Sequence, residues 1–390
     1  MLIDGLIQWE EGSQAHSAGW HSENGISAHQ KVVLADDTLT ADAAYRLACE
    51  GTALLWRGDF QNARQLLQAL VRRVDKPSKK SKRNKAKNQL QEHGALDQFH
   101  HHRLAQSQRA RILGMILIEL NAEHRISLKR APDVALACSE AYGSATESYV
   151  ISLRELLGVI SAHEWRKKGV PVPANENEVI RIYPHYGVFS PVRGEYLELV
   201  WNAALPYAVD QHSLAFDIGV GSGVLSVLLV KRGVQRVIAT DSDDRALACA
   251  KENMAHLGLT NQVEIRKANL FPAGQAALIV CNPPWLPARP SSSLEHAVYD
   301  PNSQMLKGFL HGLREHLLPE GEGWLILSDL AEHLGLRSRE TLLNWIREAG
   351  LKVIGREDIR PKHGKVFDQE DALHAARVAE LTSLWRLQAE

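Results

Sequence analysis

The 390-residue sequence has few cysteines, few aromatic residues and little net charge. Its four cysteines, Cys49, Cys138, Cys249 and Cys281, are far apart, which argues against a disulfide framework or a zinc site and favours a reducing compartment. No apolar run reaches the roughly 18 residues that span a bilayer, and residues 1–5 lack the features of a secretory signal. We therefore expect a cytoplasmic protein with no membrane segment and no metal site.

The formal net charge of −1 excludes a protein whose whole surface binds polyanions. A hydrophobic content of 45% supplies cores for two domains of ordinary size in a chain of this length. We therefore expect two folded domains.

One segment of the sequence, Arg72–Lys87, is strongly basic. It holds nine lysines and arginines against Asp75 alone, so it carries +8, and the rest of the chain carries about −9 given the net charge of −1. Ala86 is its only apolar residue between Val74 and Leu90, so the segment cannot bury a core face and is predicted to be a loop. Two interpretations stay open, a solvated linker and an electrostatic contact with RNA or another anionic partner.

The two halves of the sequence differ in periodicity. From about Thr40 to Arg166, apolar residues recur at three- and four-residue spacing, which predicts helices. A break rich in glycine and proline follows at Gly169–Pro173. We therefore predict a mainly helical domain over residues 1–175, acting in substrate recognition, and a second domain over residues 176–390.

Strand and helix patterns alternate in the second domain. The predicted strands are 214–218, 236–241, 262–267, 277–281 and 323–328, and the predicted helices are 224–232, 243–257, 305–317 and 339–349. This alternation predicts an α/β fold, a Rossmann-like doubly wound sheet with helices on both faces. Two last strands at 351–358 and 381–387 predict a final hairpin that adds an antiparallel strand at the sheet edge.

A glycine-rich turn, Asp217–Gly223, joins the first of these strands to a helix. Open α/β sheets bind ligands at the carboxyl ends of their strands, and glycine lets the backbone approach a ligand closely. A dinucleotide fingerprint needs a sixth-position glycine, which is Val224 here. The pattern D-x-G-x-G-x-G instead resembles the first motif of class I S-adenosylmethionine-dependent methyltransferases. The resemblance implies a site for S-adenosylmethionine formed by Asp217, Gly219, Gly221 and Gly223.

Two further residues follow the next two strands. Asp241 stands 22 residues after Gly219, where an acidic side chain accepts hydrogen bonds from both ribose hydroxyls. Helix capping is the alternative role for Asp241. Asn269 stands where the family usually has an aspartate facing the adenine, and its amide oxygen can accept from the adenine amino group. The alternative for Asn269 is a plain loop residue.

The motif Asn282–Trp285 follows a buried strand directly. Its prolines stop the strand and lack N–H groups. The Asn282 side-chain oxygen and the Pro283 carbonyl can accept the two N–H bonds of a planar amino group, which frees its lone pair and aims it at a methyl sulfonium. Trp285 offers a flat face on which the acceptor can stack. We predict that Asn282, Pro283 and Trp285 form the catalytic site. A strand end with a core tryptophan is the alternative.

Together these motifs resemble the amino-methyltransferases with an Asn-Pro-Pro-aromatic motif. Two other segments, Val298–Pro301 and Gly187–Pro191, are similar to segments of the HemK/PrmC-like and small-domain enzymes. HemK-like enzymes usually have tyrosine where Trp285 stands. The resemblance implies N-methyl transfer from S-adenosylmethionine to a macromolecular substrate, either a glutamine in a protein or N6 of an adenine in RNA. Two alternatives stay open, methylation of a small metabolite and a binding module that lacks activity.

Overall fold

The chain divides into two compact units, Met1–Glu164 and Trp165–Glu390. The computed structural model describes residues 3–76, 94–173, 178–191, 194–290, 295, 297–362, 368 and 371–390. The division falls within helix α6 (Leu153–Lys168), whereas the sequence predicted a boundary after residue 175. The basic segment Arg72–Lys87 lies outside the described residues from position 77 onward.

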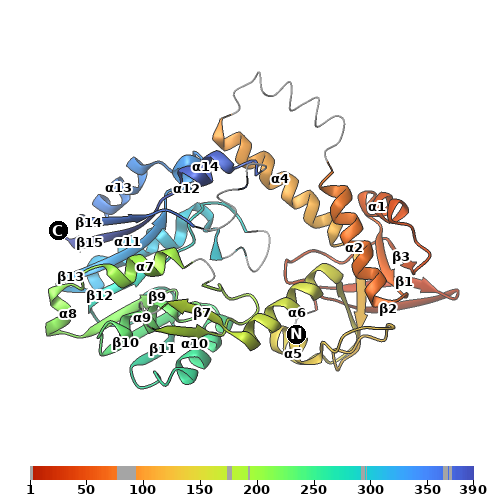
Figure 1. Ribbon diagram of the computed structural model, residues 1–390, viewed down its shortest axis with the longest axis horizontal. Helices are drawn as coiled ribbons and strands as arrows, with labels where there is room; N and C mark the ends of the chain where they lie inside the picture. The colour runs from red at the N-terminus through yellow and green to blue at the C-terminus, as the bar shows by residue number, and fades with distance from the viewer. Residues whose placement is uncertain are drawn as a thin grey trace. The chain divides into compact units, whose positions relative to one another are not determined.

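The first unit has a six-stranded sheet at its centre (Figure 1). Its strands are β1 (Leu6–Glu11), β2 (Gln14–Trp20), β3 (Val32–Ala35), β4 (Ala53–Trp56), β5 (Ile116–Leu120) and β6 (Tyr149–Ser152). Its helices are α1 (Ala41–Cys49), α2 (Phe60–Val74), α4 (Ala95–Leu113), α5 (Ala135–Tyr142) and most of α6. The strand order is β1-β2-β6-β5-β4-β3, and β3, β4 and β5 run parallel.

Helices make up a large part of this unit, as predicted, but the sequence did not predict its central sheet. Strands β4 and β5 are four and five residues long and buried along nearly their whole length. A strand that is buried on both faces shows no alternation of apolar and polar residues. Within the stretch predicted to be helical, these short runs were therefore indistinguishable from buried helix.

The second unit has a seven-stranded sheet and a separate two-stranded one. The small sheet pairs β7 (Val170–Pro173) with β8 (Val179–Ile182). The large sheet contains β9 (Leu214–Ile218), β10 (Arg236–Asp241), β11 (Val263–Lys267), β12 (Ala276–Cys281), β13 (Leu317–Ser328), β14 (Leu351–Ile359) and β15 (Thr382–Ala389). The helices are α7 (Glu195–Asn202), α8 (Tyr207–Gln211), α9 (Val224–Lys231), α10 (Asp244–His256), α11 (Gln304–His316), α12 (Leu330–His333), α13 (Arg339–Glu348) and α14 (His374–Ala379).

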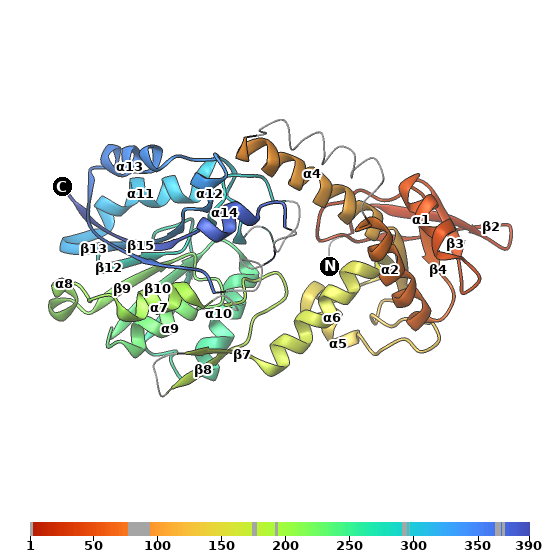
Figure 2. The same cartoon turned by 45° about the horizontal axis from the view of Figure 1, so that its top comes forward.

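The strand order β11-β10-β9-β12-β13-β15-β14 confirms the predicted doubly wound α/β sheet. Helices α7, α9 and α10 cover one face of the sheet and α11 and α13 the other (Figures 1 and 2). Their buried side chains belong to two separate cores, one on each face. The final hairpin also forms. Its antiparallel strand, β15, lies between β13 and β14 and not at the edge, so the edge strand is β14.

Three structural observations concern the features that the composition argued against: a membrane segment, disulfides and a metal site. In the described part of the chain, no helix is long and apolar enough to cross a membrane. All four cysteines are free, and only Cys49 among them is exposed. Among the described side chains, no group of three or more histidines, cysteines or acidic residues is placed to hold a metal ion.

Candidate active site

Three strand ends meet at the point where the order of the large sheet reverses direction. From β9, the chain adds β10 and β11 on one side and β12 on the other. In the register of these parallel strands, Ile218 pairs with Thr240 on one side and with Cys281 on the other. The residues that follow, Gly219, Asp241 and Asn282, therefore leave the sheet at the same level. Open α/β sheets bind their ligands at such a switch point.

The three glycines of the turn have different surroundings. All three have positive φ, between +51° and +85°. A Cβ at Gly219 would lie 2.6 Å from Cε of Met305, and a Cβ at Gly223 would lie 2.8 Å from Cε of Met254. A Cβ at Gly221 would meet no atom closer than 4.0 Å. A Cβ at Gly219 or Gly223 would thus have to displace the end of a methionine side chain, whereas Gly221 faces open space that a ligand can enter.

The Asp217 side chain is fully buried beneath this turn. Its Oδ2 accepts a hydrogen bond from Ser226 Oγ (2.6 Å), whereas Oδ1 has no partner among the described residues. Burial raises the pKa of Asp217 to about 6, against the hydrogen bonds from Ser226, which lower it. An unpaired buried acceptor of this kind fits a cofactor that brings a hydrogen-bond donor, such as the amino group of S-adenosylmethionine.

Asp241 is held by two backbone N–H groups. Its Oδ2 accepts from Gly221 N (3.1 Å) and its Oδ1 from Asp243 N (3.0 Å). Burial raises the pKa of Asp241, and these hydrogen bonds oppose the shift. Each carboxylate oxygen has lone pairs left for a ribose hydroxyl. The cap of α10 is formed by Asp243, whose side chain accepts from Arg245 N, so Asp241 is not the capping residue.

Asn269 is exposed in the loop after β11. The next residue, Leu270, has a positive φ of 71°, and its carbonyl accepts a hydrogen bond from the Thr240 hydroxyl. The loop is therefore tied to the end of β10, on the side of the turn where Asp241 lies. This position is compatible with the predicted contact to an adenine, and that role stays a prediction.

The reaction motif, Asn282–Trp285, contains a hydrogen bond that the sequence did not predict. Trp285 Nε1 donates to Asn282 Oδ1 over 2.9 Å. Asn282 and Trp285 are half-buried, and Pro283 between them is buried. The Trp285 ring packs against the cores on both faces of the sheet. Because the indole N–H uses one lone pair of the oxygen, the Asn282 amide is fixed in orientation and keeps a second lone pair for an acceptor.

The loop beyond Trp285 is anchored by the segment around Asp300. Leu286 N donates to the Val298 carbonyl (3.0 Å), and Asp300 N donates to the Leu286 carbonyl (2.8 Å). The buried Asp300 carboxylate accepts from Met305 N (3.1 Å) and Leu306 N (3.2 Å) at the start of α11. Since Met305 covers Gly219, this chain of contacts links the reaction motif to the glycine turn.

Asn253 joins the same region from α10, and no signal in a single sequence marks it. It is fully buried; its Oδ1 accepts from Tyr183 N (2.8 Å) and its Nδ2 donates to the Ser222 carbonyl (3.0 Å). It therefore ties the glycine turn to the segment leading into Gly187–Pro191.

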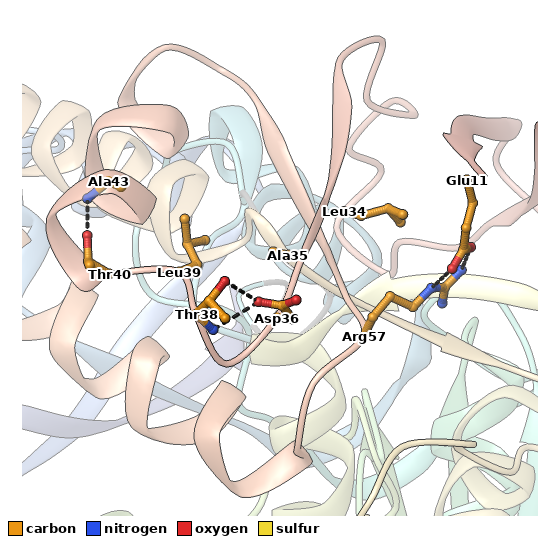
Figure 3. A pocket seen from close by; sticks show the side chains of 9 residues that line it. All are labelled: Glu11, Leu34, Ala35, Asp36, Thr38, Leu39, Thr40, Ala43 and Arg57. Atoms are coloured by element: carbon orange, nitrogen blue, oxygen red, sulfur yellow. Dashed lines mark hydrogen bonds and ion pairs between the residues drawn. The ribbon is translucent and has the colours of Figure 1, made fainter. Parts of the chain in front are cut away.

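A hollow of about 510 Å³ lies in the first unit, at the carboxyl ends of β3 and β4 (Figure 3). Its charged side chains have partners within the protein. Arg57 donates to Glu11 (2.9 Å), and Asp36 accepts from the Thr38 hydroxyl (2.6 Å). We assign no ligand to this hollow.

Part of the second unit matches proteins of known class. Residues 202–283 match the family described as ribosomal protein L11 methyltransferase (PrmA). Over 140 residues the chain is 27% identical to the ribosomal protein L11 methyltransferase of Alkaliphilus metalliredigens, covering 31% of this chain and 43% of that protein. Over 176 residues it is 30% identical to the release factor glutamine methyltransferase of Cereibacter sphaeroides, covering 42% of this chain and 58% of that protein.

Among solved structures, the ribosomal protein L11 methylase of Lactobacillus delbrueckii subsp. bulgaricus aligns with a TM-score of 0.32 at 19% identity, covering 45% of this chain and 70% of that one. The chain spans about half the length of the curated relatives it matches. The family match contains β9, the glycine turn, Asp241 and β12, and it ends at Pro283. The unit Trp165–Glu390 therefore has a Rossmann-like methyltransferase fold and is similar in sequence, over residues 202–283, to S-adenosylmethionine-dependent methyltransferases.

Proposed function

We propose that the chain transfers the methyl group of S-adenosylmethionine to a planar amide nitrogen of a protein, with a glutamine side chain as the acceptor. The observation that carries this proposal is the hydrogen bond from Trp285 to Asn282 at the end of β12. It presents an oriented amide oxygen one strand away from the cofactor turn.

On this proposal, the cofactor is held by three groups. The unpaired Asp217 Oδ1 accepts from its amino group, Asp241 accepts from its ribose hydroxyls, and Gly221 leaves the space it needs. When bound there, S-adenosylmethionine supplies an electrophilic methyl group on a cationic sulfur. The protein's own residues then have to deliver a nitrogen nucleophile in line with that methyl group.

Delivery is the role that we propose for Asn282 and Pro283. An amide nitrogen is a poor nucleophile because its lone pair is delocalised onto the carbonyl. If its two N–H bonds are directed at the Asn282 Oδ1 and the Pro283 carbonyl, the nitrogen becomes pyramidal and its lone pair is freed. As the N–CH3 bond forms, the S–CH3 bond breaks, the neutral thioether S-adenosylhomocysteine leaves, and one N–H proton of the amide is lost to water. This is catalysis by preorganised acceptors and by position, without a strong base.

The comparisons favour a protein acceptor. The curated relatives named above are described as methyltransferases of a ribosomal protein and of a release factor. We therefore rank N6 of an adenine in RNA as the second candidate acceptor. The alternative from another class, a binding module, predicts no transfer to any acceptor.

Labelled methyl donor tests the proposal. The purified chain is incubated with S-adenosyl-L-[methyl-³H]methionine and a lysate from a strain that lacks it, and the products are divided between protease and ribonuclease treatments. We expect the label to be released by protease. Hot acid then identifies the acceptor atom, because an N-methyl amide hydrolyses to volatile methylamine, whereas a methylated amine stays with its amino acid.

Label released by ribonuclease, or protein label that survives acid as a methylated amino acid, would contradict the amide assignment. Calorimetry with S-adenosylmethionine tests the remaining alternative, a binding module without activity. A binding module that lost the cofactor would release no heat of binding at high micromolar concentrations.

A further inference from the structure

Arg337 is a buried cation whose nitrogens lack partners. Its side chain lies in the loop between α12 and α13, and the residue is only 5% exposed. Its Nε and Nη2 have no hydrogen-bond partner among the described residues. A guanidinium stays protonated in proteins, and an unpaired buried charge is destabilising. Such a group is therefore expected to bind a partner of opposite charge, and the described residues supply none.

The carboxylates that act on Arg337 are already engaged elsewhere. Glu332 and Asp300 attract its charge, although burial is the larger influence and lowers the pKa of Arg337. Glu332 accepts from Arg339 Nε (2.7 Å), and Asp300 caps α11 through two backbone N–H groups. Glu332 is thus paired with Arg339, and no described carboxylate forms an ion pair with Arg337.

The position of Arg337 is on the acceptor side of the site. The loop that carries it follows β13, the neighbour of β12, so both strands end at the same edge of the sheet. Asp300, which lies within electrostatic range of Arg337, is hydrogen-bonded through its N–H to Leu286. Leu286 directly follows the reaction motif. The cofactor residues lie on the other side of the reaction motif, on β9 and β10.

We propose that Arg337 binds a carboxylate of the acceptor protein, using its Nε and Nη2 as a fork. The role as an acceptor site rests on the proposed methyltransferase function. A carboxylate matches the spacing of two guanidinium N–H groups and gives the strongest hydrogen bonds available to them. An acidic residue beside the methylated glutamine would supply this group and fix the register of the acceptor.

Acetate is the probe for the binding step, which does not depend on catalysis. The full-length protein is labelled with ¹⁵N-arginine, and the Arg337 Nε–H signal is identified by its loss in Arg337→Lys. We expect titration with acetate against chloride, at constant ionic strength, to move this signal saturably, with a Kd of about 1–10 mM for so small an anion. The matched control is Arg339, whose Nε is already paired, so its signal should not move.

No saturable shift at Arg337, or an equal shift at Arg339, would overturn the proposal. A shift with inorganic phosphate and none with acetate would also overturn it, in favour of a nucleic-acid acceptor. In methyl transfer, Arg337→Lys should raise the acceptor concentration for half-maximal rate about tenfold and leave the Kd of S-adenosylmethionine unchanged, since lysine lacks the fork.

The thermal stability of a variant distinguishes a binding role for Arg337 from a purely structural one. Because its charge is unpaired in the free protein, Arg337→Met should unfold at the same or a higher temperature than the wild type. A midpoint lowered by several degrees, with transfer kinetics unchanged, would contradict the binding role. If the wild type transfers no methyl group, the proposed function fails, and the acetate titration still decides whether Arg337 binds carboxylate.

Discussion

At the scale of single residues, burial sets the properties of Asp217. Its pKa is raised to about 6, above the ordinary value of 3.8, so the folded protein favours the protonated carboxyl. The contribution of this residue to stability is therefore highest below about pH 4 and is lost as the pH rises through 6. At neutral pH the cost is on the order of 3 kcal/mol. We assign this cost to the function of holding a cationic amino group.

We therefore expect Asp217→Asn to raise the unfolding temperature of the cofactor-free protein at pH 7.5 and to weaken S-adenosylmethionine binding at least tenfold. In the wild type, binding should tighten about tenfold between pH 5 and pH 7.5 as Asp217 ionises. Calorimetry at several pH values measures both effects. A variant with the pH profile of the wild type would show that Asp217 does not contact the cofactor.

The hydrogen bond from Trp285 makes the indole N–H part of the reaction site. Trp285→Phe keeps an aromatic ring and removes only the donor. We expect kcat to fall about fivefold to tenfold, the effect of one neutral hydrogen bond, with the Kd of S-adenosylmethionine unchanged. Single-turnover transfer measures this.

The matched control for this variant is Trp345→Phe, at a half-buried tryptophan that packs on the α11 and α13 core. It should keep the wild-type kcat. Equal rates in the two variants would mean that Trp285 serves packing alone.

At the scale of elements, the glycines of the turn Asp217–Gly223 differ in whether an added side chain would meet protein atoms or open space. Gly221→Ala places a Cβ in open space, so its cost to folding should be only the strain of a positive φ, about 1 kcal/mol. The same Cβ should reduce S-adenosylmethionine affinity more than tenfold, because it occupies the space left for the cofactor.

Gly258→Ala is the control for the turn, because Gly258 has a φ of +69° and no atom within 4 Å of an added Cβ. Chemical denaturation should give the two variants similar losses of stability, whereas calorimetry should show a binding defect in Gly221→Ala alone. Equal affinities would show that Gly221 does not face the cofactor.

Local sequence pattern predicted the strands on either side of the glycine turn. Strand β9 ends where its apolar run meets Gly219, and β10 ends at Asp241; the bounds of both strands were predicted without error. Strands β4 and β5 were missed because they are short and buried on both faces. The bond from Trp285 to Asn282 and the tie made by Asn253 depend on side-chain direction and on residues far apart in sequence. Periodicity carries no information about either.

At the scale of the whole molecule, charge is unevenly distributed. The segment Arg72–Lys87 carries +8 in a chain with a net charge of −1. A linker and a contact with an anionic partner are the two interpretations of this segment. The substrate-recognition role of the first unit likewise stays a prediction.

Neutralising four lysines of this segment to glutamine tests the interpretation as a binding segment. If the segment binds RNA, the affinity for polyuridylate should fall. The slope of the logarithm of the binding constant against the logarithm of the salt concentration should also become about 3 less steep, because each phosphate that is no longer neutralised removes roughly 0.7 from it. Filter binding over a range of salt concentrations measures this. The substituted positions are Lys79, Lys80, Lys82 and Lys85. An unchanged slope supports the linker interpretation.

The central claim is that Asn282 delivers the acceptor nitrogen and takes no part in holding the cofactor. Its most direct test is methyl transfer by Asn282→Ala, measured with labelled S-adenosylmethionine alongside calorimetry of cofactor binding. We predict a loss of transfer on the order of a hundredfold or more, by analogy with removal of an oriented polar group that acts in the transition state, with a Kd for S-adenosylmethionine within about twofold of the wild type. Transfer at a rate near that of the wild type would contradict the mechanism.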